Sequence, residues 1–138
     1  EIARYKKKIS GPILDRIDLQ VQVPHVELAD LSALRSPKGE AGADTKSMRT
    51  IVTRVRAAQI ARQGVLNSAL SSKQVADSVA LDAQALAFFG KIWKSAVLSA
   101  RGYYRLLKVA RTIADIEGAP DVSEAHVAEA FAYRLREK

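Results

Sequence analysis

Three basic residues have a spacing that could bind phosphate: Arg101, Arg105 and Lys108. On a helix, at 100° per residue, they fall within about 60° of one another. Arg101 would lie in the first helical turn, where free backbone amides and the helix dipole already attract anions. A cation there is unfavourable unless phosphate is its partner. Charged residues are also ordinary on solvated helix faces. The spacing alone therefore leaves two interpretations open, a phosphate-binding strip and a solvated face.

Arg16 is a second candidate, placed just before a segment of alternating apolar residues. Ser10 can cap a short helix that runs to Arg16, with Pro12 near its first turn, where a missing amide donor costs nothing. A guanidinium presented at such a corner can pair bidentately with phosphate or with a carboxylate. Asp15 and Asp18 offer carboxylates nearby, and the residues alone favour this local salt bridge.

An excess of basic residues could also attract nucleic acid. Lys and Arg number 22 against 15 Asp and Glu. The resulting net charge of +7 attracts polyanions without choosing among nucleic acid, nucleotides and anionic lipid. Phe88, Phe89 and Trp93 could stack on bases, but their helical spacing favours a place in a hydrophobic core. Two clusters of cations could contact DNA phosphates. The first is Lys6, Lys7 and Lys8, and the second is Arg49, Arg54, Arg56 and Arg62.

Several other kinds of site are disfavoured. The chain has no cysteine, which excludes disulfides and thiolate metal sites. His25 and His126 have no second ligand at a metal-binding spacing, and both are predicted to be surface residues. No apolar run reaches the roughly 18 residues that a membrane helix needs, and the first residues show no signal-peptide pattern. We expect a cytoplasmic protein with no membrane partner.

The elements around Arg16 point to missing neighbours. Residues 19–23 alternate apolar and polar side chains and predict one half-buried strand, closed by Pro24. A lone strand cannot pair its backbone groups, so its partner strands must come from residues upstream. The chain also opens on Glu1, in what reads as the middle of an element, so we expect an excised fragment. Pro37 and two glycines favour a flexible loop across residues 25–46.

The rest of the chain is predicted to be helical. One helix begins near Ser47, a short one begins near Ser72, and three longer ones follow. Residues able to cap or end these helices are Gly64, Asp82, Ser99, Gly118 and Ser123. The first helix has an apolar stripe of Met48, Ile51, Val52, Val55 and Ala58, and the helix after Ser99 has one of Tyr103, Leu106, Leu107, Ala110, Ile113 and Ala114. Together these elements predict a mainly α fold, a small helical bundle.

Two blocks of the chain resemble a known family. They are residues 9–19 (ISGPILDRIDL) and residues 98–115 (LSARGYYRLLKVARTIAD). Both are similar, over most positions, to the C-terminal region of magnesium-chelatase-like AAA+ ATPases of the bacterial ComM/YifB type. The resemblance runs from about Arg4 to Arg136 and lapses at residues 29–46. It implies an edge of the ATPase core with its last strand and a short helix at residues 1–24, the loop at 25–46, and a helical lid at 47–138.

The resemblance also implies roles for the two candidate regions. Arg16 matches the arginine finger that reaches the γ-phosphate of ATP in a neighbouring subunit and stabilises the charge of the transferred group. Arg101 matches the sensor 2 arginine, which contacts ATP bound to its own subunit and couples it to lid movement. Arg105 and Lys108 are weaker candidates for the same phosphates.

The sequence lacks the parts that would complete an ATPase. It has no Gly-x-x-x-x-Gly-Lys-Ser/Thr loop and no acidic strand end for magnesium. We expect the isolated chain to be inactive and to bind no cofactor, with ATP and magnesium belonging to the full-length parent. The resemblance implies that its partners are its own upstream ATPase core and neighbouring subunits of a homo-oligomer, expected to be a hexamer. It further implies a DNA motor, or helicase, in competence, transformation or recombination. The alternative is a small basic helical module that binds DNA or protein and has no nucleotide role.

Overall fold

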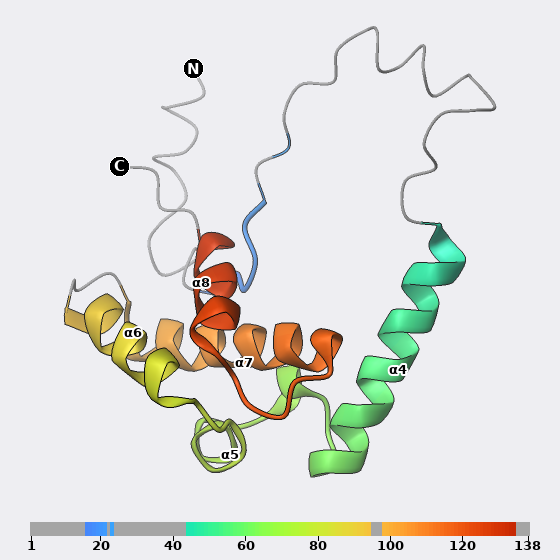
Figure 1. Ribbon diagram of the computed structural model, residues 1–138, viewed down its shortest axis with the longest axis horizontal. Helices are drawn as coiled ribbons and strands as arrows, with labels where there is room; N and C mark the ends of the chain where they lie inside the picture. Colours follow the sequence, from blue (N-terminus) through green and yellow to red (C-terminus); the bar gives the residue numbers. More distant parts are fainter. Residues whose placement is uncertain (1–15, 22, 24–43, 95–97, 135–138) are drawn as a thin grey trace, which may run out of the picture.

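The computed structural model describes residues 16–21, 23, 44–94 and 98–134. Within them the chain is mainly helical, which confirms the predicted fold class. Helix α7 crosses the middle of the molecule and the other helices pack around it (Figure 1). In chain order the elements are α4 (Thr45–Gln63), the 3-10 helix η1 (Asn67–Ala69), α5 (Ser72–Ser78), α6 (Ala83–Lys94), α7 (Ala100–Glu117) and α8 (Glu124–Ala132). No described helix is long and apolar enough to cross a membrane.

Helix α7 begins and ends where the sequence predicts. The backbone N–H of Gly102 donates to Ser99 Oγ at 3.1 Å, so Ser99 satisfies one of the free amides of the first turn. Gly118 ends the helix in the left-handed conformation, with φ of 76°, which glycine adopts without a Cβ clash. These two caps fix the residues that face the core and the residues that face outward.

The other caps follow the same chemistry. Asp82 Oδ1 accepts from the N–H of Ala85 at 2.7 Å at the start of α6, and Ser71 forms a capping box with Gln74 on α5. Ser123 precedes α8, as predicted. Helix α4 starts at Thr45, two residues before the predicted start near Ser47, a difference that is common at helix ends.

The hydrophobic core lies between α7 and the helices α5, α6 and α8. The predicted apolar face of α7 is buried there, except that Tyr103 is only partly covered. A single parallel bridge between Leu81 and Val122 links the residues before α6 to those before α8. The remaining buried side chains include Leu70, Val75, Val79, Ala85, Phe89, Ile92, Leu98, Val127 and Ala130. Burying this face removes apolar area from water and holds α7 in place.

Helix α4 departs from its prediction. Of the predicted stripe only Val55 is buried, while Met48, Ile51 and Val52 are exposed. Figure 1 shows why: α4 meets the rest of the molecule near its C-terminal end and its N-terminal half extends away. Within the described residues, the apolar stripe of α4 is therefore buried only at Val55.

The N-terminal segment forms no strand in its described part. Leu19, Val21 and Val23 are exposed, and Gln20 donates its N–H to the carbonyl of Tyr133 at 2.7 Å rather than to a neighbouring strand. The half-buried strand predicted at residues 19–23 is therefore not present in the described part of this segment. The helix predicted before Arg16 and most of the loop at 25–46 lie outside the described residues.

We predict that truncation of the core of α7 destabilises the protein strongly. Leu106 is 1% exposed, so Leu106→Ala should lower the free energy of unfolding by about 3 kcal/mol, because it removes buried methyl groups and leaves a cavity. Urea unfolding followed by circular dichroism measures this. Leu86→Ala is the matched control, because Leu86 is also helical but 61% exposed, and it should change stability by about 0.5 kcal/mol or less. Equal losses for the two variants would contradict this description of the core.

Candidate functional site

Arg101 lies in the first turn of α7, two residues after the cap at Ser99. It is exposed, and it forms no ion pair or hydrogen bond through its side chain with any described residue. The predicted strip therefore begins with a guanidinium whose donors face solvent. Since the first-turn amides and the helix dipole add positive potential there, this end of α7 favours an anion.

Arg105 lies one turn further along the same face and has protein partners. Its Nη1 donates to the backbone carbonyl of Arg16 at 2.6 Å and to Asp18 Oδ1 at 2.5 Å. The structure thus brings the strip of α7 together with the segment of Arg16, although 89 positions separate Arg16 and Arg105 in sequence. The pairing of residues so distant could not be read from the sequence.

Arg16 itself is exposed and lies in a turn. The local salt bridge that the residues favoured, between Arg16 and Asp18, is not formed. Asp18 binds Arg105 instead, because α7 places a second guanidinium against the same carboxylate. Asp15, the other local candidate, lies outside the described residues. No side-chain partner of Arg16 is present among the described residues, so its guanidinium is available.

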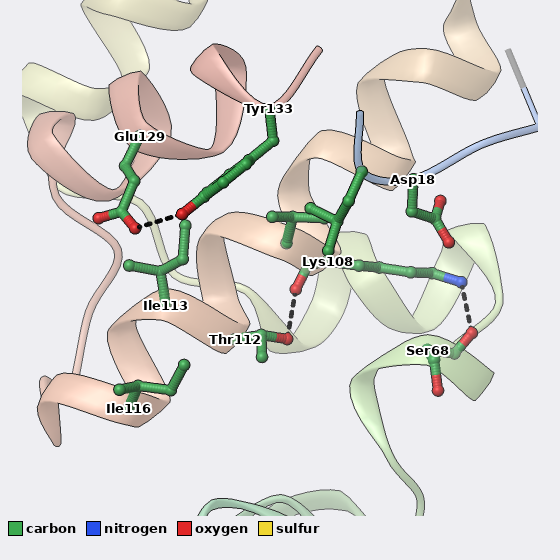
Figure 2. Close-up of a pocket in the computed structure, with 10 residues that line it drawn as sticks. Asp18, Ser68, Lys108, Thr112, Ile113, Ile116, Glu129 and Tyr133 are labelled. Atoms are coloured by element: carbon green, nitrogen blue, oxygen red, sulfur yellow. Dashed lines mark hydrogen bonds between the residues drawn. The ribbon is translucent and has the colours of Figure 1, made fainter. Parts of the chain in front are cut away.

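Lys108 faces η1 and the edge of a pocket. Its Nζ donates to the carbonyl of Ser68 at 3.1 Å, and its own carbonyl accepts from Thr112 Oγ1 at 2.8 Å (Figure 2). The pocket has a volume of about 320 Å³. Its walls are Leu19, Val109, Ile113 and Ile116, and its polar lining residues are Asp18, Ser68, Lys108, Thr112, Glu129 and Tyr133. Arg101 does not line it, so the pocket and the phosphate candidate lie at different places along α7.

A buried charged cluster joins α4, η1 and α7 at the other end of the helix. The side chain of Asp115 is only 2% exposed. Its Oδ1 accepts from Arg62 Nη1 at 2.5 Å and from Arg111 Nε at 2.9 Å, and its Oδ2 accepts from Arg62 Nη2 and Asn67 Nδ2. Arg111 also donates to the carbonyls of Ala119 and Pro120, both at 2.6 Å. Such a buried carboxylate is tolerated because every lone pair has a donor.

The pKa of Asp115 reflects a competition between burial and its partners. Burial alone would raise it, but the hydrogen bonds from Arg62 and Asn67 and the charges of Arg111 and Arg62 together hold the pKa of this carboxyl below its usual value of 3.8. At neutral pH the cluster therefore contains two cations around one anion. It is an ionic joint between helices that are far apart in sequence.

The cluster contains residues that sequence reasoning missed or misplaced. Arg111 and Asp115 were not singled out, although their i, i+4 spacing with opposite charges was a usable signal. Arg62 was considered for DNA contact, yet Asp115 holds its guanidinium bidentately. Arg54 is likewise engaged, since its Nη2 donates to the carbonyl of Ile116 at 2.8 Å. Of the four arginines on α4, Arg49 and Arg56 remain exposed without a side-chain partner among the described residues.

His126 corrects a second expectation. It is buried and not on the surface. Its polar atoms have partners there, since Nδ1 accepts from the N–H of Ser123 at 3.0 Å and Nε2 lies 2.9 Å from Glu117 Oε2. Because Nδ1 accepts this bond, Nε2 is the ring nitrogen that donates to Glu117. The described residues contain no cluster that could hold a metal ion. His25 lies outside them.

The aromatic residues pack together on one side of α7. The ring of Tyr103 meets Phe89, Trp93 and Tyr104 edge to face, with centroids 5.2, 5.9 and 5.3 Å apart. Burial, together with the neighbouring Tyr104, raises the pKa of Tyr103. Phe89 is in the core as predicted and Phe88 packs against it, but Trp93 is about half exposed and only flanks it.

Two protein-family models match the chain. The chain belongs to the family described as magnesium chelatase, subunit ChlI C-terminal, whose model matches residues 42–134. A second model, described as magnesium chelatase, subunit ChlI, matches residues 1–31. The family resemblance seen in the sequence is thereby confirmed.

Three relatives illustrate the relationship. Competence protein ComM of Haemophilus influenzae is 37% identical over 134 residues, 97% of this chain and 26% of that protein. YifB of Salmonella typhimurium is 40% identical over 95% of this chain and 25% of its own length. YifB of Escherichia coli is 37% identical over the same shares. The chain thus spans about a quarter of the length of these relatives.

We predict that Asp115→Asn destabilises the protein by about 3 kcal/mol at pH 7, because it leaves Arg111 buried without its counter-charge. The pKa of Asp115 is lower in the folded state, so its ionised form stabilises the fold above the usual value of 3.8, and this stability is lost as pH falls through the folded pKa. The difference between the variant and the original protein, measured by urea unfolding, should therefore shrink in acid below that pH. Asp77→Asn, at an exposed position on α5, is the control. A difference that does not change with pH would contradict the ionic role.

Proposed function

We propose that this chain supplies two arginines, Arg101 and Arg16, to the ATP sites of an oligomeric magnesium-chelatase-like ATPase. The observation that carries the proposal is the exposed guanidinium of Arg101 at the start of α7, which has no protein acceptor among the described residues. Family membership supplies the context in which a free cation at this place has a phosphate to bind.

Arg101 is proposed to act on nucleotide bound to its own subunit. The caps at Ser99 and Gly118 and the buried face of α7 hold the helix rigid, so a contact at Arg101 moves the whole helix. A triphosphate offers an additional anionic group compared with a diphosphate, and charge-assisted hydrogen bonds to it are strong. Arg101 would therefore distinguish the two nucleotides and convert the difference into a position of the lid.

Arg16 is proposed to act on the neighbouring subunit. Its exposed guanidinium stands on a turn beside α7, where the side chain is not tied to a local carboxylate. A cation placed against a γ-phosphate stabilises the charge that develops during phosphoryl transfer. Arg105 and Lys108 are retained as secondary phosphate candidates, although both donate to protein acceptors in this structure.

This chain could supply only some of the groups that bind ATP and magnesium. The exposed arginines suit phosphate oxygens, whereas the sequence has no phosphate-binding loop and the described residues have no metal cluster. ATP and magnesium would be held by the remaining part of a full-length protein about four times longer, as the relatives are. When bound, they supply the phosphoryl group that is transferred to water. The arginines of this chain would orient the phosphates and stabilise the negative charge that develops on the transferred group.

The same proposal extends to domains, assembly and substrate. Residues 1–24 would close the ATPase core, 25–46 would link it to the lid, and 47–138 would be the lid. The assembly would be a cytoplasmic ring, a hexamer of identical subunits, in which lid movement shifts subunit contacts. One relative bears the name competence protein, and the net charge of +7 suits a polyanion, so we propose DNA as the substrate moved by the ring.

We predict different behaviour for the two arginine variants in the full-length ATPase. Arg16→Ala and Arg101→Ala should each lower ATP turnover by about 100-fold or more, because each removes charge stabilisation of the transferred group. In mixtures, subunits with Arg16→Ala should regain hydrolysis from neighbours that keep Arg16, whereas subunits with Arg101→Ala should not. Steady-state phosphate release across mixing ratios measures this.

Lys91→Ala is the control, since Lys91 is exposed and lies on α6, a different helix from the one that carries Arg101. Turnover at the original rate in both arginine variants would refute the nucleotide roles. The basic DNA- or protein-binding module would then be favoured, and it makes its own prediction: the 138-residue chain alone should bind DNA with strong salt dependence.

A further inference from the structure

The contact between Arg105 and residues 16–18 joins the two regions to which nucleotide roles are proposed. Arg105 Nη1 donates both to the carbonyl of Arg16, at 2.6 Å, and to the carboxylate of Asp18, at 2.5 Å. A bond to the carbonyl of Arg16 fixes the backbone from which its guanidinium extends. The position of Arg16 is therefore tied directly to helix α7.

A second contact holds the far end of the same segment. The N–H of Gln20 donates to the carbonyl of Tyr133, just after α8, at 2.7 Å. Residues 16–20 are thus attached at two points, to α7 through Arg105 and to the end of α8 through Tyr133. The segment has no strand partner among the described residues, and the hydrogen bonds at these two points help to place Arg16 relative to the helices.

Arg105 and Arg101 lie on one rigid helix, four residues and about one turn apart. A displacement of α7 caused at Arg101 must move Arg105 by a similar amount, because the buried face of the helix does not deform. The bonds from Arg105 would carry that displacement to the backbone of Arg16. Arg105 would in this way couple Arg101 to Arg16, which are proposed to act on different ATP sites.

The strength of the contact suits such coupling. The side chains of Arg105 and Asp18 are 29% and 55% exposed, and exposed ion pairs contribute little to stability. The contact can therefore break and re-form without unfolding the lid. Its value lies in where it places Arg16.

We propose that Arg105 is a positioning residue, which acts with Asp18 so that nucleotide read by Arg101 in one subunit sets the presentation of Arg16 to the next. This inference rests on the proposed function. It assigns Arg105 to a protein partner instead of to phosphate. A phosphate ligand needs its positive charge, whereas the ion pair with Asp18 can also form when the two charges are exchanged.

The test is a charge exchange in the full-length ATPase. Arg105→Asp and Asp18→Arg should each lower kcat by about tenfold, the size of a typical coupling between sites, while the affinity for a non-hydrolysable ATP analogue stays unchanged. The double variant, with both substitutions, should recover part of the lost kcat, because it restores the ion pair in the opposite sense but not the hydrogen bond to the carbonyl of Arg16. Mixing with subunits carrying Arg101→Ala should show that Arg105→Asp subunits bind nucleotide normally but fail to activate their neighbours.

The controls separate this inference from the function beneath it. Lys91→Asp and Asp77→Arg make the same charge changes at exposed positions on α6 and α5 and should leave kcat unchanged. Weakened analogue binding in Arg105→Asp without recovery in the double variant would overturn the positioning role and identify Arg105 as a phosphate ligand. Original kcat in both single variants, while Arg16→Ala and Arg101→Ala lose activity, would overturn the coupling alone. Original kcat in all four would overturn the proposed function as well.

Discussion

The carboxylate of Asp115 sets the geometry on which the rest of the molecule depends. It binds two guanidinium groups and an amide, from α4, α7 and η1, and its own side chain is almost fully buried. A buried charge can persist only when its partners are fixed, so the cluster requires one relative placement of these elements. Arg111 adds the turn after α7 to the same cluster through two backbone carbonyls. Once this end of α7 is fixed, the orientation of its other end is fixed too.

Helix α7 carries the consequences of that constraint. One face is apolar and buried, the opposite face carries Arg101, Arg105 and Lys108, and the last turns carry the ionic joint. The three cations are treated differently by their surroundings. Lys108 and Arg105 bind protein oxygens, while Arg101 is left to solvent. Arg101, Arg105 and Lys108, which have similar positions by sequence spacing, therefore differ in their contacts with the rest of the protein.

Much of the fold could be predicted because local chemistry determines it. Ser99 and Gly118 bound α7 through a hydroxyl cap and a left-handed glycine, and the apolar period of 3.6 identified the buried face. Predictions failed where the outcome depends on residues far apart in sequence. The stripe on α4 has the right period, but nothing in a period tells how far a helix extends beyond its partner. His126 was predicted to lie on the surface because its burial depends on how α8 packs, whereas its bond with Ser123 is a local capping contact.

The candidate site likewise has features that the sequence predicts and features that depend on distant residues. The helix face that holds Arg101 could be predicted from spacing, whereas the capture of Asp18 by Arg105 could not, because a nearer arginine competed for it in sequence. The roles proposed for Arg16 and Arg101 rest on the family resemblance, and the structure adds that both residues are exposed.

We propose above all that Arg101 contacts the nucleotide of its own subunit. The most direct test is to measure how tightly the full-length protein binds a non-hydrolysable ATP analogue and ADP. We expect Arg101→Ala to weaken analogue binding by about tenfold or more, the effect of a lost charged hydrogen bond, and to leave ADP binding nearly unchanged. Equal affinities in the variant and the original protein for both nucleotides would contradict the account.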